Sequence, residues 1–176
     1  MRKKRASRPR RAVRLDYSQR LARGLPRLGS HLAIVVTLHL LTEFVLDRLI
    51  KSKSPTPKRI LDDSRTFTYS VKLVLVRNMG LIDEPLFRNL DALRRLRNEY
   101  AHGLDVDLAA KLNLGFVERD GKPVFRRLSE TVKTVRDDPE GAGISALMSI
   151  ADATFGQLHA TCVALGVDLE HDAVAK

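Results

Sequence analysis

Two helix-forming segments of the chain are separated by only three residues, and this short connection strongly limits the folds available. The segments cover about 64–79 and 83–102. Gly80 stands where a helix end favours a left-handed residue, and Asp83 can cap the second helix, whose first turn accepts Pro85. A connection this short places the two helices side by side and antiparallel. The sequence therefore predicts a helical hairpin.

Further helices are expected on both sides of this hairpin. Ser30 can cap a long helix over 30–50, whose apolar residues cover a broad arc, so this helix should be buried on more than one side. A last helix is expected over 138–165, and a short one over 15–25. Residues 116–125 form either a small β-hairpin or an ordered loop. The predicted fold class is all-α, a bundle of about four to six helices.

The charge of the chain is concentrated at its N-terminus. The chain carries 31 Lys or Arg and 21 Asp or Glu, a formal net charge of +10 at pH 7. Residues 1–14 hold eight of the basic side chains and no acidic one, so the remainder is nearly neutral. Such blocks of like charge stay disordered and often serve as interaction tails. We interpret 1–14 as a disordered basic arm, 15–170 as the helical domain and 171–176 as a tail.

The basic arm has two interpretations. Its side chains either neutralise the phosphates of RNA or DNA, or they only keep the protein in solution. The residues that would contact nucleic acid are Arg2, Lys3, Lys4 and Arg5.

The cellular compartment can be predicted from the segments that follow the basic arm and from the cysteine content. No apolar stretch of the signal-peptide type comes after it. The longest apolar window, 32–50, contains four charged or titratable side chains, which makes a membrane span unfavourable. Cys162 is the single cysteine, so an intrachain disulfide is impossible, and we expect it to be a small buried residue. The sequence therefore predicts a cytoplasmic protein without a membrane span.

The segment 83–102 carries the chemically most informative residues. With roughly 100° of rotation per residue, Arg97 falls in the middle of the arc formed by the apolar residues of this helix. A guanidinium in an apolar arc is unfavourable unless it is paired or faces a cleft or a partner. Arg94 lies at the edge of the arc and Asn98 flanks it. His102 is in the last turn, where its direction depends on how the helix ends, and its imidazole can exchange protons near neutral pH.

A polar strip runs along the long helix before the hairpin. His39, Glu43 and Asp47 are spaced four residues apart, and they form either a solvated face or, less simply, a metal site. Alternatively, Glu43 supplies the carboxylate that pairs with Arg97. Lys72 either contacts phosphate or is an ordinary surface lysine. We predict no bound metal and no cofactor.

The last turns of the segment 83–102 resemble a known motif. Arg97, four intervening residues and His102 resemble the R-x(4–6)-H motif of HEPN domains. A Gly-Leu-Ile turn precedes Arg97-Asn98-Glu99-Tyr100-Ala101-His102, and the whole pattern is similar to the mannitol operon repressor family, which carries an R-N-x-aromatic-A-H signature. The similarity covers about residues 28–104. It implies a HEPN-like helical fold and a homodimer.

The resemblance also implies a chemistry. Many HEPN proteins are metal-independent endoribonucleases of toxin–antitoxin or phage-defence systems. By this resemblance, His102 would transfer a proton at the ribose 2′-oxygen or the leaving oxygen, and Arg97 would hold the scissile phosphate. Asn98 would orient one of them. Apart from the resemblance, Arg94 and Lys72 are candidate contacts to the nucleic acid because they lie near the motif. An antitoxin or regulatory protein would be a further partner.

Regulation without catalysis is the alternative that the same resemblance leaves open. Mannitol-repressor-like proteins are described as regulators, yet this sequence shows no DNA-reading helix-turn-helix. A regulator of this kind would act through protein–protein contacts. The sequence thus predicts either an RNA-directed protein or such a regulator.

Overall fold

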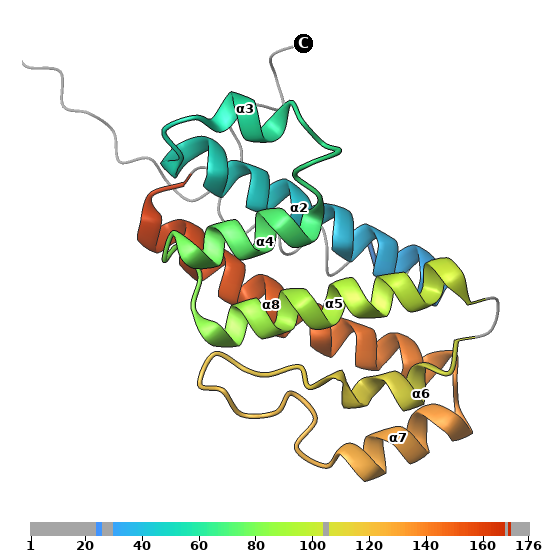
Figure 1. Cartoon of the computed structure of the whole chain (residues 1–176). Coiled ribbons are helices and arrows are strands. Elements are labelled where there is room, and N and C mark those ends of the chain that lie inside the picture. Colours follow the sequence, from blue (N-terminus) through green and yellow to red (C-terminus); the bar gives the residue numbers. More distant parts are fainter. Residues whose placement is uncertain (1–23, 26–29, 104–105, 168, 170–176) are drawn as a thin grey trace, which may run out of the picture.

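The computed structural model describes residues 24–25, 30–103, 106–167 and 169, and these residues form an all-α fold (Figure 1). The helices are α2 (His31–Lys53), α3 (Pro57–Leu61), α4 (Tyr69–Asn78), α5 (Glu84–His102), α6 (Leu108–Lys111), α7 (Leu128–Asp137) and α8 (Gly141–Leu165), with a 3₁₀ turn, η2 (Leu112–Leu114), after α6. The predicted all-α class is confirmed. The short helices α3, α6 and α7 were not predicted.

The predicted helical hairpin is formed by α4 and α5. Asp83 caps α5 by accepting a hydrogen bond from the backbone N–H of Leu86 at 3.0 Å. Gly80 adopts a φ of 69°, a left-handed conformation that glycine reaches without steric penalty. The first helix of the pair begins at Tyr69 rather than near 64, because residues 64–67 form a separate turn.

Three long helices, α2, α5 and α8, run side by side and form the centre of the bundle (Figure 1). One part of the core joins the first half of α2 and the second half of α5 with α6, α7 and the start of α8. The other part joins the remaining halves of α2 and α5 with α3, α4 and the end of α8. Both parts of the core therefore depend on how α2 packs against α5. None of the described helices is long and apolar enough to cross a membrane.

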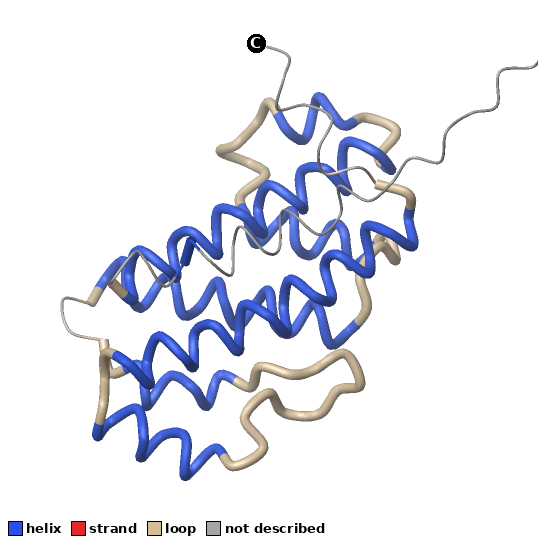
Figure 2. The backbone as a smooth tube through the Cα atoms, turned by 180° about the vertical axis from the view of Figure 1, so that it is seen from behind, coloured by secondary structure: helices blue, strands red, loops and turns tan. Residues whose placement is uncertain are grey.

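The segment 115–127 is an ordered loop that lies beside α5 (Figure 2). The sequence allowed a β-hairpin in this region. The described residues form a single isolated bridge there, between Val117 and Pro123. The Asn89 amide of α5 instead holds the loop, donating to the Val117 carbonyl and accepting from its N–H, both at 2.7 Å. Gln157 of α8 donates to the same carbonyl at 2.9 Å. The side-chain amides therefore add to two backbone hydrogen bonds across the loop, from the Glu118 N–H to the Lys122 carbonyl and from the Val124 N–H to the Phe116 carbonyl.

Replacing Asn89 with alanine is expected to lower the free energy of unfolding by about 2–3 kcal/mol. The Val117 N–H would lose its acceptor in a buried position, whereas the Val117 carbonyl would still accept from Gln157. Urea unfolding measures the change. Asn113→Ala, at an exposed position, is the matched control and should stay within about 0.5 kcal/mol. A similarly small change for both variants would contradict the proposal that the Asn89 amide holds the loop 115–127.

Several predicted features lie outside the described residues. They include the basic arm 1–14, with Arg2, Lys3, Lys4 and Arg5, and the tail 171–176. Most of the helix expected over 15–25 lies outside too, but Leu25 is described and is buried in the core. The arm, the tail and this helix therefore stay predictions. Cys162 is buried as expected, and its burial raises the pKa of the thiol to about 11.

Candidate functional site

The second half of α5 carries the three residues assigned a catalytic role by resemblance, Arg97, Asn98 and His102. The helix stays regular through His102 and ends at Gly103, whose N–H donates to the Glu99 carbonyl at 2.8 Å. His102 is exposed, and it projects roughly 140° around the helix from Arg97. Arg97 and Asn98 are half-buried. The regular helix end thus fixes the direction that the sequence left open for His102.

Arg97 lies at the edge of the buried face of α5 rather than within it. The buried residues of the helix are Leu86, Asn89, Leu90, Ala92, Leu93 and Leu96. This set places Arg97 roughly 60° from the centre of the buried face. The central position predicted from the sequence was wrong, because Asn89 belongs to the buried face, where it holds the loop 115–127.

The three arginines in this half of α5 differ in their partners. Arg94 and Arg95 both form ion pairs with Asp91, at 2.7 and 2.6 Å. Arg97 donates a single hydrogen bond, to the amide oxygen of Asn98 at 3.3 Å. Among the described residues, no carboxylate lies within ion-pair distance of Arg97. Its charge is therefore available to an external anion.

Lys72 is buried, and its ammonium is paired with two carboxylates. Its Nζ lies 3.0 Å from a Glu43 oxygen and 2.8 Å from an Asp47 oxygen, and its side chain is 6% exposed. A buried ammonium requires such carboxylates, and two residues one turn apart on α2 supply them. Two expectations are therefore corrected: Lys72 is neither a surface lysine nor a free phosphate contact, and Glu43 pairs with Lys72 rather than with Arg97.

His39, from the strip considered as a solvated face, is also buried, with 9% of the residue exposed. Its ring stacks on that of Tyr69 with 4.2 Å between the centroids. The Tyr69 hydroxyl and the Thr42 hydroxyl share a hydrogen bond at 3.0 Å. The strip therefore faces α4, with His39 buried and the carboxylates of Glu43 and Asp47 about one third exposed. The metal alternative is not supported either, since no three His, Cys, Asp or Glu side chains in the described part of the chain could hold a metal ion.

The environment of His39 connects it to the arginines of α5. Burial lowers the pKa of His39 below 6.5, the nearby charges of Arg97 and Arg94 lower it further, and Glu43 opposes them. The imidazole is therefore neutral at pH 7. Packing of α2 against α5 thus brings a neutral histidine close to the unpaired guanidinium. This proximity could not be predicted from the sequence, because it depends on the register between two helices.

Comparison with known proteins gives no match to this chain, whether by family model, by curated protein or by solved structure. The similarity of the Arg97–His102 segment to the HEPN motif therefore stays a prediction. The chemistry of the site depends on its own residues: an unpaired guanidinium, a neutral amide, a buried neutral imidazole and an exposed imidazole.

Proposed function

We propose that this protein binds RNA along the second half of α5 and cleaves it as a metal-independent endoribonuclease of a toxin–antitoxin or phage-defence system. The observation that carries the proposal is the guanidinium of Arg97, which lacks a carboxylate partner among the described residues while its neighbours Arg94 and Arg95 are paired. An unpaired guanidinium at a half-buried position favours an anionic ligand, and phosphate matches its fork of donors.

The side chains of α5 form a continuous polar strip on the second half of the helix. Going around the helix from Arg97, Arg94 comes next, then Asn98, and then His102, with roughly 40–60° between successive positions. Arg97 and His102 are separated by about 7–8 Å along the helix axis. Because the two side chains also project roughly 140° apart around the helix, a phosphate at Arg97 and a ribose at His102 would most simply meet where two copies of the strip face each other.

Each residue of the strip has a definite part in this proposal. Arg97 binds the scissile phosphate and stabilises the charge that develops on it. Asn98 accepts a hydrogen bond from Arg97 and so orients the guanidinium. His102 transfers a proton as the ribose 2′-oxygen attacks phosphorus and the bond to the 5′-oxygen breaks. The 2′-proton leaves, the 5′-oxygen gains one, and the products are a 2′,3′-cyclic phosphate and a 5′-hydroxyl.

The proposal includes partners that the family resemblance implies. A homodimer would bring two copies of the α5 strip into one cleft, and an antitoxin would restrain the activity. The basic arm 1–14 would add contacts to phosphates that weaken with salt. The need for a 2′-hydroxyl favours RNA over DNA as the substrate.

Replacing Arg97 with glutamine is expected to weaken the binding of single-stranded RNA about tenfold, because hydrogen bonds to a charged group contribute roughly 1.5–3 kcal/mol. Fluorescence anisotropy at constant salt measures the dissociation constant. Arg95→Gln removes the same charge from the same helix, but Arg95 is exposed and paired with Asp91. This control should lose less than about threefold. Equal losses in the two variants would argue against a phosphate site at Arg97.

Regulation through protein contacts is a second candidate, favoured by exposed apolar side chains on α2 and α4. These are Leu40 at 59%, Val74 at 49%, Val71 at 40% and Phe44 at 39%. Leu40 and Phe44 lie one turn apart on α2, as do Val71 and Val74 on α4, and exposed apolar side chains that adjoin one another mark surfaces that bind proteins. A well-folded wild-type protein that binds no RNA would favour this candidate.

A further inference from the structure

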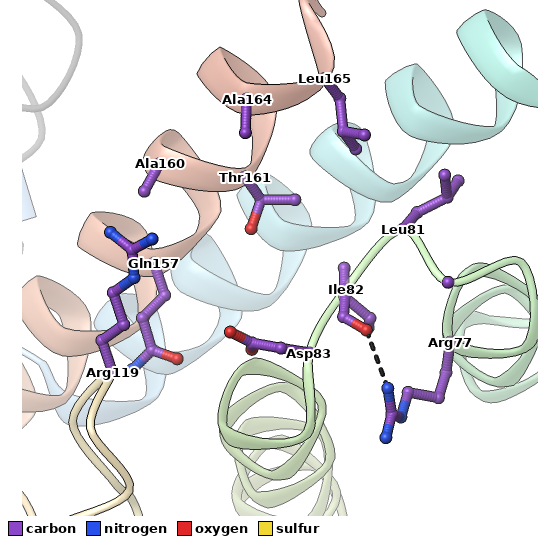
Figure 3. Close-up of a pocket in the computed structure, with 11 residues that line it drawn as sticks. Arg77, Leu81, Ile82, Asp83, Arg119, Gln157, Ala160, Thr161, Ala164 and Leu165 are labelled. Carbon is purple, nitrogen blue, oxygen red and sulfur yellow. Dashed lines mark hydrogen bonds between the residues drawn. The ribbon is translucent and has the colours of Figure 1, made fainter.

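A cavity of about 370 Å³ lies at the N-terminal end of α5. Its walls are the turn between α4 and α5, the last part of α8 and the loop 115–127 (Figure 3). His102 is at the opposite end of α5, roughly 25 Å away along the helix axis. The volume is within the range of small-molecule sites, about 300–1,000 Å³. The cavity is thus separate from the proposed RNA site.

Two polar groups of the cavity lack partners in the described part of the chain. Arg119, on the loop 115–127, is exposed and forms no hydrogen bond or ion pair there. Gln157 is 5% exposed, and its amide nitrogen is used by the Val117 carbonyl, but no donor reaches its oxygen. An unsatisfied buried acceptor destabilises the folded protein. A bound molecule with N–H donors near Gln157 would relieve this penalty.

The remaining polar groups of the cavity complement these two. Figure 3 shows the Gln157 oxygen directed toward Asp83, and the Thr161 hydroxyl above the same carboxylate. One oxygen of Asp83 caps α5, which leaves the other for a ligand. Arg77 is already engaged, since it donates to the Ile82 carbonyl and pairs with Glu84, both at 3.1 Å. The cavity therefore offers one free cation, one carboxylate and two neutral acceptors.

We propose that this cavity binds a small molecule with both an ammonium and a carboxylate group, namely an apolar α-amino acid or a short apolar peptide. The ligand carboxylate pairs with Arg119, and its ammonium donates toward Asp83 and Gln157. Its apolar side chain contacts the wall formed by Leu81, Ala164 and Leu165. A ligand with only one charge would leave either Arg119 or Asp83 without a counter-charge. This site is independent of the proposed nuclease activity.

Isothermal titration calorimetry with the full chain tests the proposal. The probes are L-leucine, L-valine, L-methionine, L-phenylalanine and the dipeptide Leu-Leu. We expect saturable binding of at least one probe, and binding at least tenfold weaker for its amide and its N-acetyl derivative, each of which lacks one charge. A preference for the dipeptide assigns the site to peptides, and a preference for a free amino acid assigns it to amino acids.

A matched pair of variants connects the binding to the cavity. Arg119→Gln should weaken binding at least tenfold, because among the described residues of the cavity it removes the cation that has no carboxylate partner. Arg126→Gln changes an exposed arginine of the same loop outside the cavity and should stay within about twofold. The proposal is overturned if no probe binds wild-type protein at about 10 mM, or if the two variants bind the probe equally.

Discussion

Replacing Lys72 with methionine is expected to lower the free energy of unfolding by about 2–4 kcal/mol. The variant loses the ammonium that lies between Glu43 and Asp47, so two carboxylates one helical turn apart remain without a cation. Breaking a fully buried ion pair is unfavourable by about 3–5 kcal/mol. The two carboxylate side chains are 31% and 36% exposed, so water screens part of the loss. Urea unfolding at pH 7 measures the effect.

Two further variants separate the lost ion pairs from other effects of the substitution. Lys58→Met, at an exposed lysine of α3, should change the free energy of unfolding by less than about 0.5 kcal/mol. Adding Glu43→Gln and Asp47→Asn to Lys72→Met should recover at least half of the loss, because the repelling charges are gone. The structural role of Lys72 would be refuted if Lys72→Met were as stable as Lys58→Met.

The pH dependence of this contribution has a definite sign. Burial lowers the pKa of Lys72, but the hydrogen bonds and charges of Asp47 and Glu43 outweigh burial and raise it. Because the folded pKa lies above the unfolded value, the contribution is complete below about pH 10.5 and is lost only as the pH rises through the folded pKa. The ion pairs therefore remain intact over the whole physiological range.

The ends of α5 and α8 could be predicted because the residues that set them are local. Asp83 caps α5 within its own first turn, and α8 ends where Gly166 adopts a φ of 67°. Each of these features depends on a few neighbouring residues, whose preferences are written in a short stretch of sequence. The predicted boundaries of α5 consequently agree with the structure to within one residue at its N-terminus.

The burial of polar side chains could not be predicted in the same way, because their partners are distant in the chain. Lys72 is 29 residues from Glu43, and Asn89 is 28 residues from Val117. The helical wheel did contain a hint, since Asn89 lies between leucines on the buried side of α5. Leaving Asn89 out of the apolar arc moved Arg97 toward the middle of it. The partner of Glu43 was missed for the same reason: it depends on how α4 packs against α2.

Replacing His102 with alanine is expected to lower the rate of RNA cleavage about 10²–10⁴-fold, the usual contribution of a positioned acid or base. Its side chain is exposed and belongs to neither part of the core, so the fold and the affinity for RNA should change little. The assay uses end-labelled single-stranded RNA in EDTA. DNA of the same sequence should stay intact because it lacks the attacking 2′-hydroxyl.

The comparison of His102→Ala with two other variants decides between catalysis and binding. His159→Ala removes another exposed histidine, on α8, and should retain the full rate. Arg97→Gln should lose affinity as well as rate, whereas His102→Ala should lose rate alone. Wild-type protein that binds RNA but leaves it uncut would limit the α5 strip to binding. Equal cleavage by wild type and both histidine variants would contradict the proposed role of His102, because the exposed imidazole at the end of α5 would then take no part in the reaction.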